Sequence, residues 1–342
     1  MSILALLAAC RSPTPCVSGP PREPSAWAAT LTDQRFTSGA LGLPDGQGAI
    51  EPVQGVSADA LVRTDGEQVY VVGRSTEDTV RAFDPLDPRC PVWETALPEL
   101  SNAHDLLAHD GRLFVPTFGT GALHVLDPGS GELLETLELG ETLDRAVAVD
   151  GRILVADQRF QPDVRRDGVL HIVDPAGLTV TDTLPAGPNP RLTPADDGVW
   201  VATGWFAFAP ATYDADLVDG ALAHLDPATG TWTEVTTEAA LGGDLHTVVA
   251  AGETLVTVAV DGLARSSVAC IRDGEVLEGP TDAGWLLTGA AVGPEVLLGV
   301  RSSLVVGQAS TSDPGILTLD PVTCAATGFT STTLEPYDLV AL

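Results

Sequence analysis

The chain has 342 residues, and 47 acidic against 17 basic residues give it a formal net charge of −30. All 17 basic residues are arginine, so a P-loop, a Schiff-base enzyme and a pyridoxal enzyme, which each need a lysine, are excluded. The charge also opposes binding to nucleic acid and to anionic lipid surfaces. A hydrophobic content of 44% is typical of a folded protein rather than a disordered one.

An apolar run opens the chain. Residues 3–9 are wholly apolar, and the sequence LAAC (7–10) resembles the lipobox of bacterial lipoprotein signals. The resemblance implies that residues 1–9 are a signal segment and that Cys10 is lipidated after cleavage. No basic segment precedes the run, so we expect the true start to lie upstream. The alternative is a short buried strand with a chance cysteine.

A proline-rich stretch follows Cys10. Residues 11–25 contain five prolines and show no apolar periodicity, which predicts a flexible tether over residues 10–25. No other apolar run approaches the roughly 18 residues that span a bilayer, so the anchor would be lipid. Arg11 follows the lipobox cysteine, and the resemblance to sorted lipoproteins then implies the outer membrane.

Four cysteines remain if Cys10 is lipidated. An even number in an oxidising compartment predicts disulfides, and three pairings are open. We favour Cys270 with Cys324, which leaves Cys16 with Cys90. The alternative is four buried free thiols. No CxxC motif or Cys/His spacing indicates zinc.

One unit recurs along the chain, most clearly over residues 103–128, 144–175 and 191–227. It consists of an apolar segment, an Asp-Gly turn, a second segment, a loop, a third segment that ends at Asp, and a fourth. Alternating Val, Leu and Thr between Gly, Asp and Pro predicts strands. The third segments end at Asp45, Asp84, Asp127, Asp174, Asp226, Asp273 and Asp320. Their mean spacing, about 46 residues, is typical of four-stranded propeller blades.

The two ends of the chain complement each other. Residues 27–53 supply a second, third and fourth strand but no first, whereas residues 336–342 look like a first strand without a blade. Joining them closes a ring and protects the strand edges. We therefore predict an all-β, seven-bladed β-propeller of four-stranded antiparallel blades over residues 26–342, with one helical turn within 237–243. Six or eight blades remain the alternative if the Asp273 or N-terminal unit is misassigned.

Several short motifs resemble those of YVTN-type propellers, particularly the lipoprotein members. They are DGR at 110–112 and 150–152, DPGSG at 127–131, DPATG at 226–230 and VYVVGR at 69–74. The resemblance covers nearly all of the chain after the tether and implies the same fold. It implies no single activity, because such repeats specify architecture rather than chemistry.

Two sets of loops lie on one face of a propeller, around the mouth of its central channel. The candidate ligand-binding residues on them are His104, Asp105, Arg145, Arg159, Arg191, Trp205, His246 and Asp338. Arg145 and Arg191 would hold a carboxylate or phosphate by bidentate hydrogen bonds. The alternative is that Asp and Arg at successive blade starts pair with one another and cap backbone groups. Trp205 belongs to a long aromatic loop over residues 204–220.

A metal site is the second possibility that the sequence leaves open. His104 and His246, together with Asp244, could bind a divalent metal such as calcium, and hydrogen bonding around the channel is the simpler alternative. The acidic stretch 214–220 lacks EF-hand spacing. The nucleophile motifs GxSxG, HExxH and SxxK are absent, so we expect no cofactor and no catalytic residue.

The sequence thus predicts a non-catalytic, lipid-anchored propeller at the outer membrane of the bacterial cell envelope. We expect it to be a monomer that binds a small molecule or an envelope protein at the channel mouth. It would contact no nucleic acid, and it would touch the membrane only through its lipid. The alternative is a metal-assisted lyase or lactonase with its site in the central channel. A haem propeller is disfavoured because no CxxCH motif exists, and a quinone propeller because no tryptophan-docking repeat resembles the quinoprotein blades.

Overall fold

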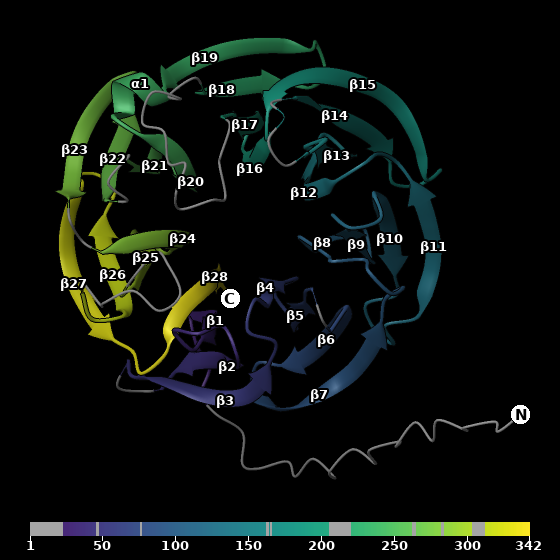
Figure 1. Ribbon diagram of the computed structural model, residues 1–342, viewed down its shortest axis with the longest axis horizontal. Helices are drawn as coiled ribbons and strands as arrows, with labels where there is room; N and C mark the ends of the chain where they lie inside the picture. Colours follow the sequence, from purple (N-terminus) through teal and green to yellow (C-terminus); the bar gives the residue numbers. More distant parts are fainter. Residues whose placement is uncertain are drawn as a thin grey trace, which may run out of the picture.

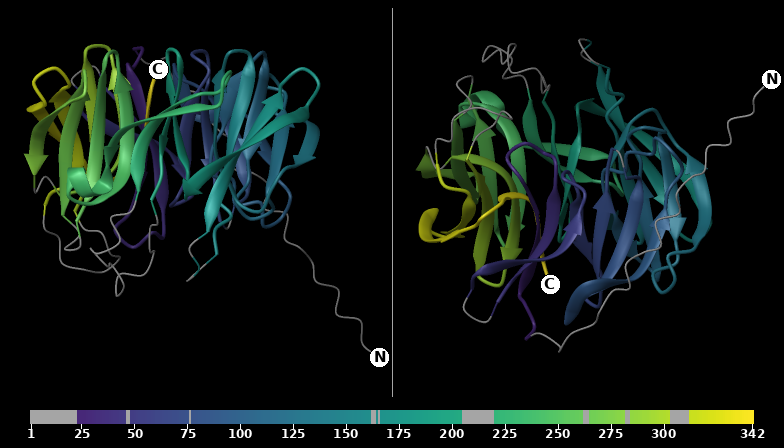
Figure 2. Two further views of the ribbon diagram at one scale, coloured as in Figure 1. Left: turned by 90° about the horizontal axis from the view of Figure 1, so that it is seen from above. Right: turned by 60° about the horizontal axis from the view of Figure 1, so that its bottom comes forward.

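A computed structural model describes residues 23–45, 48–75, 77–161, 164, 166–204, 220–261, 265–281, 284–302 and 312–342. Seven antiparallel sheets of four strands stand around one axis, as Figure 1 shows down that axis and Figure 2 from the side. The predicted seven-bladed propeller is therefore confirmed. We number the blades 1 to 7 along the chain and give their strands from the axis outwards.

Blade 1 contains β28 (Glu335–Ala341), β1 (Trp27–Thr32), β2 (Gly39–Pro44) and β3 (Ile50–Val56). Blade 2 contains β4 (Leu61–Thr64), β5 (Val69–Gly73), β6 (Thr79–Asp84) and β7 (Asp87–Ala96). Blade 3 contains β8 (Leu107–His109), β9 (Arg112–Pro116), β10 (Ala122–Leu126) and β11 (Leu133–Glu138). Blade 4 contains β12 (Leu143–Val149), β13 (Arg152–Asp157), β14 (Asp167–Asp174) and β15 (Thr179–Pro188).

Blade 5 contains β16 (Arg191–Ala195), β17 (Gly198–Ala202), β18 (Ala221–Asp226) and β19 (Thr231–Thr237). The single helical turn α1 (Glu238–Leu241) follows it, within the range that the sequence predicted. Blade 6 contains β20 (Asp244–Ala251), β21 (Thr254–Val260), β22 (Ser266–Arg272) and β23 (Glu275–Thr281). Blade 7 contains β24 (Trp285–Val292), β25 (Glu295–Arg301), β26 (Gly315–Asp320) and β27 (Ala325–Ser331).

The ring is closed by the C-terminal strand, as the complementary chain ends predicted. β28 pairs antiparallel with β1, so that Ala29 lies opposite Leu339 and Ala28 opposite Val340. The innermost strand of blade 1 therefore comes from the far end of the sequence, and unfolding of either end opens the ring. This pairing removes the two edges that an open set of blades would expose.

The seven aspartates that marked the repeat end the third strand of each blade or directly follow it. Six of them accept a backbone N–H from the turn that follows: Asp45, Asp84, Asp127, Asp174, Asp226 and Asp320. The seventh, Asp273, instead forms a two-residue turn with Gly274, and both have positive φ angles of 52° and 78°. That tight turn distinguishes blade 6 from the other blades, and its aspartate still marks the end of a third strand.

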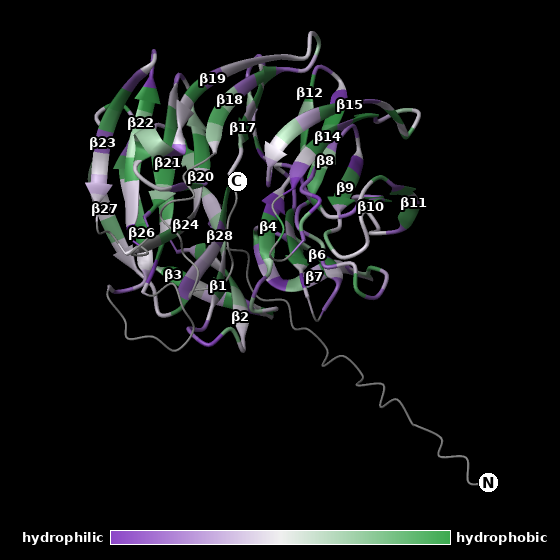
Figure 3. Ribbon diagram, turned by 45° about the horizontal axis from the view of Figure 1, so that its top comes forward, coloured by the Kyte–Doolittle hydropathy of each residue, from purple (hydrophilic) through white to green (hydrophobic). Residues whose placement is uncertain are grey.

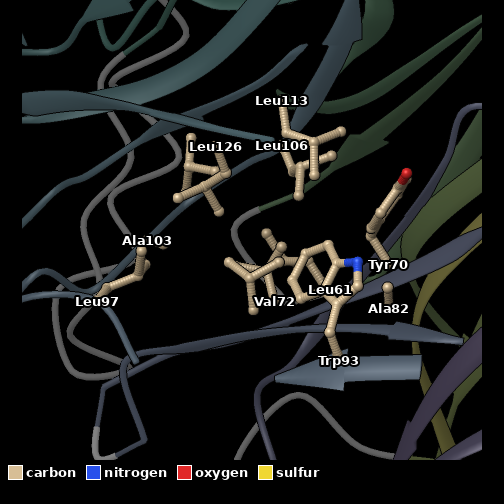
Figure 4. Close-up of a cluster of buried hydrophobic side chains, with 12 residues drawn as sticks. Leu61, Tyr70, Val72, Ala82, Trp93, Leu97, Ala103, Leu106, Leu113 and Leu126 are labelled. Atoms are coloured by element: carbon tan, nitrogen blue, oxygen red, sulfur yellow. The ribbon is translucent and has the colours of Figure 1, made fainter. Parts of the chain in front are cut away.

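The core lies within and between the blades rather than at one centre. Figure 4 shows one cluster in which Leu61, Tyr70 and Trp93 of blade 2 pack against Leu113 and Leu126 of blade 3. Figure 3 shows hydrophobic stretches on the strands of every blade and hydrophilic ones mostly at the turns between strands. Burial of these apolar faces between neighbouring blades supplies the main driving force for folding.

A disulfide joins blades 6 and 7. Cys270 and Cys324 are bonded with a Cα–Cα distance of 5.6 Å, which confirms the predicted pair. Cys90 is also disulfide-bonded, and its predicted partner, Cys16, lies outside the described residues. Within the described part of the chain, no helix is long and apolar enough to cross a membrane.

Candidate functional site

Antiparallel order places two kinds of loop on the same face of the disc. The loops that enter each innermost strand and those that join second and third strands lie together at this end, which we call the mouth face. The candidate residues that the sequence indicated come from these loops and from the first residues of the innermost strands. The mouth face is therefore where a site has to be sought.

β-bulges at this end of the innermost strands re-aim polar side chains. In β12 the register shifts between Leu143 and Ala146, so that Asp144 and Arg145 face a single partner residue. The same irregularity adds one residue to three other innermost strands, β28, β20 and β24. In β28 the added residue is Tyr337, and in β20 it is His246. Such bulges break strict alternation and commonly occur beside functional sites.

A belt of polar contacts joins the inner strands of blades 1 to 4. Arg63 donates to Asp105 at 2.5 Å and to Asp338, and the side chains of these two residues are 6% and 9% exposed. Asp338 also accepts the backbone N–H of Val62, and Asp105 accepts that of Ala146. Burial alone would lower the pKa of Arg63, but the two carboxylates raise it, so this guanidinium stays charged.

Two further candidate residues continue this belt into blades 5 and 6. Arg145 donates through Nη1 to the carbonyl of Leu192 at 3.4 Å. Arg191 donates to the carbonyls of His246, at 3.0 Å, and of Leu245. Four residues that the sequence placed around a ligand thus bond neighbouring blades: Asp105, Arg145, Arg191 and Asp338. These contacts match the alternative in which residues at the blade starts pair with one another and cap backbone groups.

A second set of side chains lies closer to the mouth and spans five blades. We call it the mouth network; it comprises Arg301, Phe36, Tyr337, Arg74, His104 and Asp144. The Arg301 guanidinium carbon lies 4.5 Å above the centre of the Phe36 ring. Phe36 meets Tyr337 edge-on at 5.8 Å, and the Tyr337 hydroxyl accepts a hydrogen bond from Arg74 Nη1 at 3.1 Å.

His104 occupies the centre of the network and has a defined tautomer. Its Nε2 lies 2.7 Å from Arg74 Nη2 and its Nδ1 lies 3.0 Å from Asp144 Oδ1. Because a guanidinium only donates, Nε2 must be the acceptor and the proton must be on Nδ1. His104 is therefore neutral and joins Arg74 to Asp144.

The electrostatics of the network agree with this assignment. Burial lowers the pKa of His104, and the positive charge of Arg74 lowers it further, against the opposing effect of Asp144. Burial would raise the pKa of Asp144, but the hydrogen bond from His104 and the charges of Arg145 and Arg191 hold it below its usual value. The carboxylate is thus charged and the imidazole neutral near pH 7.

Aromatic rings form one wall of the site. Phe118 stacks on His104 with a centroid distance of 4.3 Å and an interplanar angle of 14°. Phe160 lies 5.8 Å from Phe118. These rings come from the loops between second and third strands of blades 3 and 4, and they present a flat apolar surface next to polar groups.

Strained backbone gathers in the same loops. Phe36, Ser75, Asn102 and Arg159 have positive φ angles of 54°, 56°, 43° and 50°. For side chains such as Phe and Arg this conformation is unfavourable and persists only where the surroundings impose it. Hydrogen bonds between the loops supply that constraint, since Ser75 donates its backbone N–H to the Asn102 side chain.

The remaining candidates do not form a second site among the described residues. Arg159 lies 3.8 Å from Asp157 and is 38% exposed, and His246 Nδ1 contacts Thr247 Oγ1 at 3.3 Å. No three His, Cys, Asp or Glu side chains in the described ranges lie close enough to hold a metal ion, so His104, His246 and Asp244 do not come together. Trp205, residues 214–219 of the acidic stretch and Cys10 lie outside the described residues.

Of the six residues of the mouth network, only His104 was among the candidates taken from the sequence. Arg63 of the polar belt and Phe118 of the aromatic wall were not among them either. A signal for Arg301 was present in the repeat. The segments VVGR (71–74) and LLGVR (297–301) are similar, and each ends in an arginine. Arg74 directly follows β5, and Arg301 is the last residue of β25. An arginine at the same point in two blades of the repeat indicated a shared place at the mouth.

Comparison with known proteins supports the architecture. No protein-family model matches the chain, and no curated protein is similar to it in sequence. Among solved structures, BamB from Moraxella catarrhalis is 14% identical with a TM-score of 0.54, over 94% of this chain and 87% of that one. A putative 6-phosphogluconolactonase from Bacteroides fragilis is 14% identical with a TM-score of 0.60, over 93% and 99%. AztD from Citrobacter koseri is 13% identical with a TM-score of 0.54, over 93% and 98%. At such identities the likeness establishes the fold alone.

Proposed function

We propose that this propeller is a binding protein of the bacterial cell envelope and that its ligand site is the mouth network. One observation carries the proposal: an unbroken chain of contacts from Arg301 to Asp144 crosses blades 7, 1, 2, 3 and 4. Charged, neutral polar and aromatic groups meet there on strained loops held by a rigid ring. Few precisely placed polar groups on an apolar surface are typical of small-molecule sites.

Binding is favoured over catalysis by the state of His104. An imidazole held by a carboxylate, as His104 is by Asp144, is the usual arrangement of a general base. Here the second ring nitrogen accepts from Arg74 at 2.7 Å, so its lone pair is taken. The network therefore supports recognition more directly than proton abstraction.

A metal-assisted lyase or lactonase remains the alternative proposal. It is supported by the fold shared with the putative 6-phosphogluconolactonase and by the pairing of His104 with Asp144. A purified protein that binds calcium, and hydrolyses a lactone only with that calcium, would favour the alternative.

The envelope location rests on the sequence and on one structural observation. The lipobox at residues 7–10 supports a lipid anchor on Cys10. The disulfide between Cys270 and Cys324 supports an oxidising compartment. Incorporation of labelled palmitate that disappears in Cys10→Ala would support the anchor, and an unlabelled wild type would contradict it.

The site assignment is tested by a thermal-shift screen with small molecules that are anionic, neutral and cationic. A ligand at 100 times its Kd stabilises the folded protein by about 2.7 kcal/mol. We expect at least one compound to stabilise the wild type, and the shift to disappear in Phe118→Ala and His104→Gln. Arg272→Gln is the control, because Arg272 is 41% exposed on the opposite face. Hits that persist in both site variants would contradict the assignment.

A further inference from the structure

Arg301 is a buried arginine whose guanidinium forms no hydrogen bond with the residues that the structure describes. The residue is 4% exposed, its Nε is buried without a hydrogen-bond partner, and no hydrogen bond joins its terminal nitrogens to another described residue. Its charged partner, Glu335, is 3.9 Å from Nε, beyond hydrogen-bond distance. Buried guanidinium groups are normally bonded, because an unmet buried donor is costly.

The neighbours of Arg301 explain why its donors stay unmet. Both oxygens of Glu335 are used by Ser302, one by its backbone N–H at 2.7 Å and one by its hydroxyl. Phe36 lies under the guanidinium and stabilises its charge through a cation–π contact. A ring face leaves the N–H groups in the guanidinium plane available. The Nε atom is buried, whereas the two terminal nitrogens are not among the fully buried unpartnered atoms.

Arg74 adds a second unmet donor on the other side of Tyr337. Its terminal nitrogens bond Tyr337 and His104, and its Nε is buried without a partner. It forms no ion pair within the described residues. The carboxylates of the polar belt, by contrast, already accept hydrogen bonds, as Asp105 and Asp338 do from Arg63. Asp59, the other carboxylate near Tyr337, accepts hydrogen bonds from the hydroxyls of Ser57 and Ser75. The Nε groups of Arg301 and Arg74 are both buried without a partner in this part of the site.

We propose that the mouth network binds a small molecule through a carboxylate, with the terminal nitrogens of Arg301 donating to its oxygens. The inference rests on the proposed function and specifies its ligand. The planar fork of arginine matches a carboxylate in geometry and charge. Phe36 and Tyr337 beside it provide an apolar surface for the remainder of the ligand. Burial and the nearby carboxylate of Glu335 disfavour a doubly charged phosphate relative to a singly charged group.

The test is isothermal titration calorimetry of the full chain with benzoate, benzamide and inorganic phosphate. Benzoate and benzamide differ in charge but share the ring, so the pair isolates the carboxylate. We expect benzoate to bind more tightly than the other two, and Arg301→Gln to weaken benzoate at least ~10-fold, since hydrogen bonds to charged groups are strong. Arg272→Gln should bind as the wild type does.

A second variant serves as a control that distinguishes loss of the binding group from loss of the fold. Arg301→Lys retains the charge but not the fork, so benzoate binding should fall between those of the wild type and Arg301→Gln, with an unchanged circular dichroism spectrum. The proposal is overturned if benzoate does not bind, if benzamide or phosphate binds as tightly, or if both Arg301 variants bind benzoate like the wild type. A neutral hit in the screen that depends on Phe118 but not on Arg301 would sink this inference and leave the proposed function standing.

Discussion

Arg63 gives the sharpest test of how the ring is held together. It is the only cation, among the described residues, that bonds both Asp105 and Asp338, which belong to blades on either side of it. The side chains are 18%, 6% and 9% exposed, so the three charges are largely removed from water. Arg63→Met leaves Asp105 with the backbone N–H of Ala146, and Asp338 with the backbone N–H of Val62 and the hydroxyl of Thr288, but neither carboxylate with a cation.

Removing one partner of a buried ion pair destabilises by about 3–5 kcal/mol, because the remaining charge is uncompensated. We expect a loss of that size in the free energy of unfolding of Arg63→Met, measured by tryptophan fluorescence in urea with an unchanged m value. Adding Asp105→Asn and Asp338→Asn should recover part of it. The exposed pair of Arg272 and Glu253 supplies the control, and Arg272→Met should change stability by less than about 1 kcal/mol. If Arg63→Met stays within about 1 kcal/mol of the wild type, the polar belt is not what joins the blades.

Three further outcomes are expected from urea unfolding. Replacing Cys270 and Cys324 together with serine should lower stability by about 2–4 kcal/mol, and a reductant should destabilise the wild type more than this variant, which keeps the disulfide of Cys90; equal midpoints of the oxidised wild type and the variant would contradict the cross-link. Burial, with the charges of Arg191 and Arg145, lowers the pKa of His246 to about 3, so below pH ~6.5 only the unfolded chain takes up this proton. Its contribution is complete above pH ~6.5 and is lost as the pH falls towards 3, by up to about 1.4 kcal/mol per unit, and His246→Gln should flatten that slope. An identical pH dependence in the variant would refute the assignment. Gly121→Ala should lower the free energy of unfolding by well over 1 kcal/mol, because φ at Gly121 is 67° and an added Cβ would meet the Gly140 carbonyl. Gly111→Ala should lower it by only about 1 kcal/mol, because φ is 69° but the space around Gly111 is open. Equal losses in the two variants would contradict this.

The architecture was readable from the sequence because the repeat carries it in local signals. Asp127 and Asp174 end strands whose turns they cap, and Asp110-Gly111 forms a tight turn with φ angles of 48° and 69°. Each of these turns is determined by interactions within a few residues, so it can be recognised in the sequence without knowledge of the tertiary structure. The ring closure followed from counting strands at the two ends.

The site was less predictable because its geometry depends on contacts between blades. The sequence placed His104 at the mouth, where the structure has it, but gave no sign that its partners would be Arg74 and Asp144. A bulge that turns both Asp144 and Arg145 out of the ladder is invisible to a two-residue strand period. Arg191 likewise reaches carbonyls of the next blade, a distance that sequence spacing does not encode.

A crystal structure of the protein soaked with benzoate would show whether the carboxylate binds at Arg301. We predict electron density for the carboxylate at the terminal nitrogens of Arg301, with the ring against Phe36 and Tyr337 and with His104 still between Arg74 and Asp144. Density for benzoate only at another face of the propeller, or an Arg301 guanidinium that remains without an acceptor in the soaked crystal, would contradict the account.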